Sequence, residues 1–137
     1  FHLRDEESNR DARFVENLCE KYNLTYNSID FDTVDYASDK NISIEMAARE
    51  LRYNWFEELR MQNNAACIAV AHHQDDSIET IILNLTRGTG IKGLTGIKAK
   101  NGHIIRPFLN ISRNEIEDYI AQNGLSYITD RTIHETK

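Results

Sequence analysis

The feature that most constrains this chain is a short apolar run that leads directly into a cluster of polar side chains. Residues 67–71 have the length and β-branched content of a buried strand. His72-His73-Gln74-Asp75-Asp76 follows, and apolar residues then recur at helical spacing as far as Leu85. Open parallel sheets bind ligands at the carboxyl ends of their strands. The pattern therefore predicts a ligand site between this strand and this helix.

Two carboxylates stand out on the predicted helix, which we place at residues 76–86. Asp76 and Glu79 are three residues apart and share one helical face. Carboxylates and imidazoles gathered at one strand end are costly to bury unless they have a function. Two other interpretations stay open on the spacing alone. Asp75 or Asp76 could act only as a helix cap, or the His-His-x-Asp-Asp cluster could bind a divalent metal ion.

Length and composition indicate one domain with a real hydrophobic core. The chain has 137 residues, of which 40% are hydrophobic. No apolar run approaches the ~18 residues of a membrane span, and no secretory signal peptide is evident. Cys19 and Cys67 lie among apolar neighbours without a Cys-x-x-Cys motif. We therefore expect buried thiols in a reducing compartment, and a cytoplasmic protein with no membrane partner.

Charge is distributed unevenly along the chain. The net charge of −6 argues against a wholly basic nucleic-acid binder. Residues 80–114, however, contain no acidic residue and six basic ones. This window is either a face that binds a polyanion or a solvated loop region of chance composition. Its basic residues are Arg87, Lys92, Lys98, Lys100, Arg106 and Arg113.

Helical and strand patterns alternate, which predicts an α/β fold with a mostly parallel sheet. We expect helices at residues 9–22, from the cap Ser43 through Leu59, at 76–86, and from the cap Ser112 to the stop signal at Gly124. We expect strands at residues 24–31, 67–71, 94–98, 103–106 and 125–128, a polar loop at 32–41, and a hairpin turn at Asn101-Gly102. Residues 129–137 show no pattern.

Two further groups could contact phosphate. Residues 87–96 hold four of the six glycines, and glycine lets backbone N–H groups approach a ligand closely. The segment lacks the ending of a Walker loop, so a flexible loop is the alternative. Arg49 and Arg52 lie off the apolar stripe of their helix, which indicates either a solvated face or a phosphate contact.

The stretch from His72 to Thr80, continued from Leu85 to Gly96, resembles the central signature of the tRNA(Ile)-lysidine synthetase family of PP-loop ATPases. The likeness covers residues 1–128 and implies part of a Rossmann-like, adenine nucleotide alpha hydrolase-like catalytic domain, with 129–137 as an unassigned tail. Related tRNA thiolation enzymes share that fold but usually bring cysteine pairs, which are absent here. Three other stretches agree: His2-Leu3-Arg4, Glu45-x-x-Ala48-Arg49-x-x-Arg52-Tyr53, and Arg106-Pro107-Phe108-Leu109 with Arg113-x-Glu115-Ile116.

The chain departs from the family pattern near both ends. The family's ATP-gripping Ser-Gly-Gly-x-Asp-Ser loop is not in the sequence, and it would lie before Phe1. After Asp130, the residues Arg131-Thr132-Ile133-His134 do not match the family's Asp-Ser-x-Asn segment. We therefore expect a piece of a longer enzyme, incomplete at the N-terminus and without the C-terminal tRNA-binding region. We expect this piece to be inactive alone.

The resemblance implies an ATP- and Mg²⁺-dependent ligase that joins L-lysine to the wobble cytidine of tRNA(Ile). In that reaction the cytosine C2 oxygen attacks the α-phosphate, and the lysine amine then displaces AMP. A homodimer stays open. By the same resemblance, the catalytic residues are His72, Asp76 and Glu79; the substrate or phosphate contacts are Arg49, Arg52, His73, Arg87 and Lys92; the tRNA contacts are Lys98, Lys100 and Arg106; and the metal ligand is Asp75.

Two functions from other classes remain as alternatives. A metal-dependent phosphoesterase would use the His-His-x-Asp-Asp cluster, would hold a metal ion tightly, and would act without ATP. A non-catalytic remnant would bind a nucleotide or RNA after losing the glycine-rich ATP loop. The first alternative needs a cluster of metal ligands that converge in space.

Overall fold

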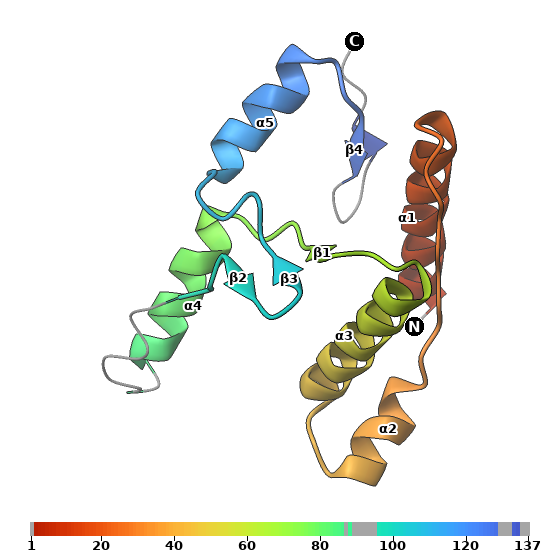
Figure 1. Ribbon diagram of the computed structural model, residues 1–137, viewed down its shortest axis with the longest axis vertical. Coiled ribbons are helices and arrows are strands. Elements are labelled where there is room, and N and C mark those ends of the chain that lie inside the picture. The colour runs from red at the N-terminus through yellow and green to blue at the C-terminus, as the bar shows by residue number, and fades with distance from the viewer. Residues whose placement is uncertain (1, 87, 89–95, 129–132, 135–137) are drawn as a thin grey trace. The chain divides into compact units, whose positions relative to one another are not determined.

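The structure is a computed structural model that describes residues 2–86, 88, 96–128 and 133–134 (Figure 1). It divides into two compact units. One unit comprises Thr33–Tyr119, and the other comprises Phe1–Asp32 with Ile120–Lys137. The Thr33–Tyr119 unit contains the whole polar cluster that follows the predicted central strand.

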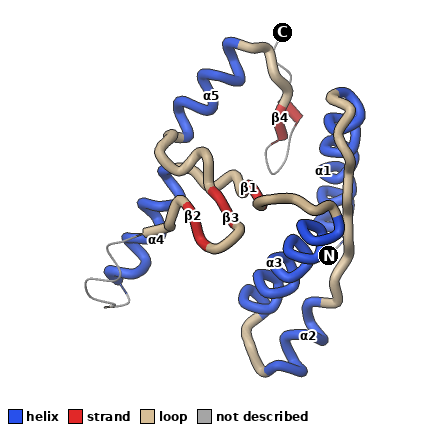
Figure 2. The backbone as a smooth tube through the Cα atoms, viewed as in Figure 1, coloured by secondary structure: helices blue, strands red, loops and turns tan. Residues whose placement is uncertain are grey.

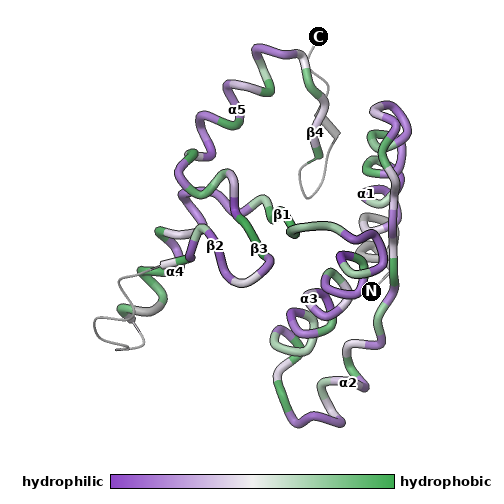
Figure 3. The backbone as a smooth tube through the Cα atoms, in the orientation of Figure 1, coloured by the Kyte–Doolittle hydropathy of each residue, from purple (hydrophilic) through white to green (hydrophobic). Residues whose placement is uncertain are grey.

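The Thr33–Tyr119 unit contains a small mixed sheet flanked by helices (Figure 2). The strand order is β1-β3-β2, in which β1 and β3 are parallel and β2 and β3 are antiparallel. The hydrophobic strands β1 and β3 are green in Figure 3. The elements are α2 (Thr33–Lys40), α3 (Ile44–Gln62), β1 (Ile68–Ala69), α4 (Gln74–Thr86), β2 (Lys100–Asn101), β3 (Ile104–Ile105) and most of α5 (Arg113–Gln122).

The helix α2 replaces the polar loop that we expected at residues 32–41, so that prediction is wrong. The sequence of α2 is mostly polar, but α2 contacts α3. Ala37 of α2 and Ala47 of α3 are both buried, at 5% and 0% exposure. Tyr36 Oη also donates to Glu50 Oε2 over 3.0 Å. The helix is therefore stabilised by packing on α3 rather than by its own periodicity.

The start of α3 follows the prediction. Ser43 is its N-cap, and the Ser43 hydroxyl accepts a hydrogen bond from Met46 N over 3.1 Å. At the other end, Arg60 pairs with Glu57 and donates to the carbonyl of Ala65 over 3.1 Å. This bond ties the last turn of α3 to the segment that enters β1.

The hairpin at β2 and β3 is confirmed, but its turn lies one residue later than predicted. Asn101 pairs with Ile104, so Gly102 and His103 form the two-residue turn. Gly102 has a φ of 60° at the first turn position, where type II′ hairpins require glycine. The expected strand at 67–71 is shorter, at Ile68–Ala69, and the described part of 94–98 is not a strand.

The other unit contains α1 (His2–Lys21) and an antiparallel pair, β4 (Tyr127–Ile128) and β5 (Ile133–His134). The expected helix at 9–22 is confirmed and begins earlier. The strand expected at 24–31 is wrong: those residues pair with none of the described strands, so their backbone groups have no ladder to join. β5 lies in the segment where the sequence showed no pattern.

The predicted α/β class is confirmed, whereas the mostly parallel sheet is not. Among the described strands, one pairing is parallel and two are antiparallel. Both cysteines are free, but Cys67 is exposed, so its predicted burial is wrong. The apolar stripe of α4 is also half exposed, with Ile78 at 50% and Leu85 at 53%. Within the described residues, no helix combines the length and the apolar character needed to cross a membrane.

Candidate functional site

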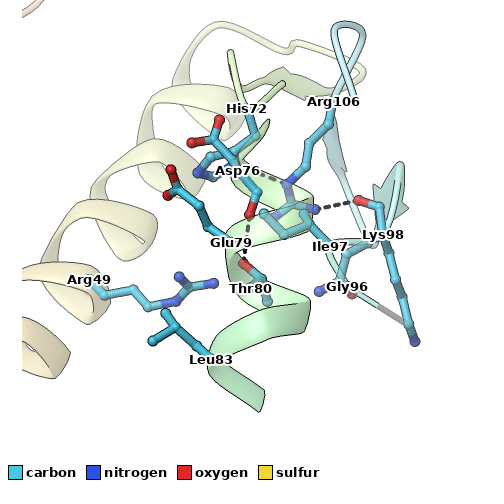
Figure 4. Close-up of a pocket in the computed structure, with 11 residues that line it drawn as sticks. Arg49, His72, Asp76, Glu79, Thr80, Leu83, Gly96, Ile97, Lys98 and Arg106 are labelled. Carbon is cyan, nitrogen blue, oxygen red and sulfur yellow. Dashed lines mark hydrogen bonds between the residues drawn. The ribbon is translucent and has the colours of Figure 1, made fainter. Parts of the chain in front are cut away.

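A cavity of about 440 Å³ in the Thr33–Tyr119 unit brings together the three predicted catalytic residues (Figure 4). His72 comes from the segment after β1, and Asp76 and Glu79 come from the first turns of α4. The remaining lining residues come from α3, from later turns of α4, from the segment 96–98 before the hairpin, and from the hairpin with the residue after it. The full lining is Arg49, His72, Asp76, Glu79, Thr80, Leu83, Gly96, Ile97, Lys98, Asn101 and Arg106.

Asp76 closes the first turn of α4 as well as lining the cavity. Its Oδ2 accepts a hydrogen bond from the backbone N–H of His73 over 2.8 Å. His73 immediately precedes α4, so this bond is the return half of a capping box. The carboxylate also sits at the positive end of the helix dipole. Asp76 therefore helps to cap α4 and also lines the cavity, and its catalytic role stays a prediction.

Asp75 points to a different neighbour and does not line this cavity. Its Oδ1 accepts a hydrogen bond from Arg113 N, the first residue of α5, over 3.1 Å. Gln74 N donates to Ile111 O over 2.9 Å beside it. Asp75 therefore joins the start of α4 to the start of α5.

His72 and Arg106 form the most buried polar pair of the site. Arg106 is 7% exposed, and its Nε donates to His72 Nδ1 over 3.1 Å. Its Nη1 donates to the carbonyl oxygen of Lys98 over 2.8 Å. Within the described part of the chain, no carboxylate forms an ion pair with Arg106. The cavity wall therefore carries a buried positive charge that is not paired with any carboxylate of the described residues.

The pKa of His72 is lowered from its usual 6.5, which keeps the imidazole neutral at pH 7. Burial is the largest cause, and the positive charge of Arg106 is the next. Asp76 acts in the opposite direction, and Arg49 and Arg52 add smaller lowering effects.

His73, a predicted phosphate contact, does not line this cavity. Its Nδ1 lies 3.5 Å from Asp76 Oδ2 and 4.0 Å from Asp75 Oδ1. The two histidines therefore separate, one toward Arg106 and one toward the aspartates. Across the described ranges, no three His, Cys, Asp or Glu side chains converge to hold a metal ion. The phosphoesterase alternative gains no support from this geometry.

Glu79 and Arg49 face the cavity from opposite helices (Figure 4). Glu79 is exposed and has no hydrogen bond or ion pair among the described residues. The guanidinium of Arg49 lies 5.0 Å from the ring centroid of Tyr53, a cation–π contact between two residues of α3. Arg52 approaches the same ring at 5.7 Å and does not line the cavity.

The basic residues that the sequence predicted as tRNA contacts do not lie together in the structure. Lys98 reaches Arg106 through its carbonyl, while its side chain extends away from the other cavity residues (Figure 4). Lys100 is exposed on β2 and outside the lining. Arg106 is 7% exposed and lines the cavity, and its contact with tRNA stays a prediction. Arg87 and Lys92 lie outside the described residues.

Four lining residues were not singled out from the sequence as site residues: Thr80, Leu83, Ile97 and Asn101. Helical spacing could have found two, because Thr80 and Leu83 follow Asp76 and Glu79 by four residues each. Gly96, a fifth lining residue, belongs to the glycine-rich segment 87–96 that the sequence indicated as a candidate phosphate contact. A Cβ built on Gly96 would lie 2.6 Å from Ser77 Oγ, so this residue lets the chain pass close to α4.

The arrangement offers both signs of charge to a ligand. The Asp76 and Glu79 carboxylates can hold an ammonium group, whereas Arg106 and Arg49 can hold an anionic oxygen. The neutral His72 can donate one further hydrogen bond. The cavity therefore suits two ligands, one that carries an ammonium group and one that carries an anionic oxygen.

Comparison with known proteins identifies the family. A family profile described as PP-loop domain matches residues 1–137. A tRNA(Ile)-lysidine synthase of Bacteroides thetaiotaomicron is 60% identical over 132 residues, which are 96% of this chain and 31% of the relative. The enzymes of the same name from Porphyromonas gingivalis W83 and Clostridium tetani are 52% and 43% identical, over 100% and 95% of this chain.

The chain spans about 30% of the length of these curated relatives. The profile match over all 137 residues shows that the chain belongs to the PP-loop domain family.

Proposed function

We propose that this chain forms the substrate cavity of an ATP-dependent tRNA(Ile)-lysidine synthase. The enzyme would join L-lysine to C2 of the wobble cytidine of tRNA(Ile) with the CAU anticodon. The observation that carries the proposal is that two carboxylates line one cavity together with a buried arginine that forms no ion pair with any described carboxylate. The names of the similar proteins support the same reaction.

The proposal includes a Rossmann-like, adenine nucleotide alpha hydrolase-like domain. The parallel pair β1–β3, with α4 following β1 along the chain, is consistent with one crossover unit of such a sheet. The domain would cover residues 1–128. Residues 133–134 pair with β4, so the proposed tail at 129–137 adds a strand to the preceding segment.

The carboxylate side of the cavity would hold the lysine. Asp76 already has one hydrogen bond from His73, whereas Glu79 has none among the described residues, so Glu79 is the freer acceptor for an ammonium group. Charge-assisted hydrogen bonds of this kind are about twice as strong as neutral ones. The two side chains would orient the lysine so that one deprotonated amine faces the activated base.

The cationic side would hold phosphate. ATP, when bound, supplies the adenylyl group that activates C2 of the cytosine and then leaves as AMP. Arg106 fits such an anion, because a buried guanidinium without a carboxylate partner needs a counterion. Arg49 would add a second positive charge, and His72 would donate from its imidazole.

Mg²⁺ stays a prediction. The described residues do not form a three-ligand metal site, and one oxygen of Asp75 already accepts from Arg113 N. Mg²⁺ usually binds through one or two carboxylates together with substrate phosphates. Contacts of Lys98 and Lys100 with tRNA, a homodimer and a cytoplasmic location also stay predictions.

A partition experiment tests the proposal. Pyrophosphate release and lysine transfer are measured separately on tRNA, using the whole polypeptide that contains these residues. Glu79→Gln should keep pyrophosphate release and lower kcat/KM for lysine about 10- to 150-fold, the equivalent of one charged hydrogen bond. Glu117→Gln, an exposed carboxylate of α5, is the matched control. Equal loss of both steps would contradict the division of the cavity into two sides.

A further inference from the structure

The guanidinium of Arg106 is held in one orientation by its neighbours. Its Nη1 donates to the carbonyl oxygen of Lys98 over 2.8 Å, and its backbone N–H donates to Ala99 O over 2.8 Å. Its Nε is then directed at His72 Nδ1, 3.1 Å away. Since the side chain is buried, water offers little competition for these bonds.

This geometry determines where His72 carries its proton. An arginine side chain donates hydrogen bonds and cannot accept one, and it stays charged at any working pH. His72 Nδ1 must therefore present a lone pair to Arg106 Nε. A neutral imidazole has a single N–H, which then lies on Nε2. A proton on Nδ1 would set two N–H groups against each other and place two positive charges in contact.

We propose that Arg106, in addition to the phosphate contact proposed above, positions His72: it holds His72 as the neutral Nε2–H tautomer, so that His72 offers one hydrogen-bond donor to an anionic oxygen of a substrate. His72 would therefore serve as a fixed neutral donor and not as an imidazolium. The part of this proposal that concerns substrate rests on the proposed function, whereas the tautomer itself does not.

The charged groups around His72 explain why the imidazole needs to be kept neutral. Asp76 on α4 favours the imidazolium, while Arg106, Arg49 and Arg52 disfavour it. Glu79 and Lys98 line the same cavity. An imidazolium beside Asp76 would be an internal counterion for a carboxylate that the lysine ammonium is proposed to use. By preventing it, Arg106 keeps Asp76 available to the substrate.

Nuclear magnetic resonance tests the tautomer directly. Long-range ¹H–¹⁵N spectra of the whole polypeptide, labelled with [¹⁵N]histidine, distinguish a protonated from an unprotonated ring nitrogen. The His72 signal is assigned by its loss in His72→Asn. We expect an unprotonated Nδ1 and a protonated Nε2 at neutral pH, with a pKa below the usual 6.5. A proton on Nδ1 in the unsubstituted protein would overturn the proposal without any variant.

Three variants then separate positioning from a merely structural role. Arg106→Met removes the donor, so His72 should populate both tautomers and titrate at a higher pH. Arg106→Lys keeps a charged donor and should restore most of the original behaviour. Lys40→Met removes the same charge from the end of α2 and should leave the His72 signal unchanged. If Arg106→Met folds with an unchanged His72 spectrum, the proposal is wrong.

Activity gives an independent second readout. In Arg106→Met, lysine transfer should develop an acid limb near the titration of His72, which Arg106→Lys should reduce. An identical pH profile in Arg106→Met and the unsubstituted enzyme would contradict the role toward substrate. If the enzyme transfers no lysine at all, the proposed function fails, while the spectra still decide the tautomer.

Discussion

Asp76→Asn separates the two roles that the structure gives to the Asp76 carboxylate. In the first role, Oδ2 accepts the His73 N–H over 2.8 Å and closes the first turn of α4. In the second, the negative charge faces the cavity that we propose for lysine. Asparagine keeps an oxygen acceptor of nearly the same shape and removes only the charge. The variant therefore tests the charge while preserving the cap.

The expected magnitudes differ enough to decide between the two roles. Asparagine keeps an oxygen that can accept the His73 N–H, so the loss of charge in the first turn of α4 should cost only about 0.3–1 kcal/mol of stability. A hydrogen bond to a charged group contributes roughly 1.5–3 kcal/mol, which corresponds to about a 10- to 150-fold fall in kcat/KM for lysine. Substrate capture should therefore suffer far more than folding.

The assay compares lysine transfer with thermal unfolding followed by circular dichroism. Asp118→Asn, which removes an exposed carboxylate from α5, is the matched control and should change neither quantity. A folded Asp76→Asn enzyme with wild-type kcat/KM for lysine would refute the assignment of this carboxylate to the substrate. Loss of folding would instead show that the charge itself is required by α4.

Three further predictions concern stability and pH. Gly96→Ala should lower the free energy of unfolding by more than the ~1–2 kcal/mol of left-handed backbone strain, because the new Cβ would lie 2.6 Å from Ser77 Oγ. Gly102→Ala is the control for strain alone, since Gly102 has a similar φ and nothing within 4 Å of a built Cβ. Equal losses of stability in chemical denaturation would disprove the close approach at Gly96. Asp75→Ala should lower the free energy of unfolding by about 0.5–2 kcal/mol and should speed hydrogen exchange at the Arg113 amide. Asp75→Asn keeps an oxygen acceptor and should preserve the protection of that amide. If Asp75→Ala leaves the exchange rate unchanged, the hydrogen bond between α4 and α5 is wrong. The pKa of His72 is lower in the folded protein than in the unfolded chain, so the contribution of His72 to stability is present above about pH 6.5 and is lost as the pH falls toward the folded pKa. The thermal midpoint should therefore fall in mildly acidic buffer, and His72→Gln should make that fall smaller. A parallel decline in both proteins would contradict the depressed pKa.

The parts of the fold that depend on local pattern could be predicted from the sequence. The step from β1 into α4 follows from an apolar run, a polar cluster and helical spacing, all within a few residues of one another. Ser43 and Ser112 cap their helices as expected, because a cap depends only on residues three positions away. The shared face of Asp76 and Glu79 follows from the same local geometry.

The parts that depend on distant partners could not be predicted. The helix α2 needs its contact with α3, and residues 24–31 resemble a strand but have no described partner to pair with. The burial of Arg106 is another example, since it depends on the approach of Lys98 and His72 in space. Spacing could propose a polar site but could not show that His73 would lie outside the cavity lining.

Transfer of labelled lysine to bulk tRNA, with and without ATP, tests the central claim most directly. The whole polypeptide that contains these residues should be used, with arginine and ornithine as competing amino acids. The cavity predicts labelling that requires ATP and selects lysine, because Asp76, Glu79 and Arg106 offer opposite charges to two different substrates. A folded enzyme that labels no tRNA, or labels it without ATP, would contradict the account.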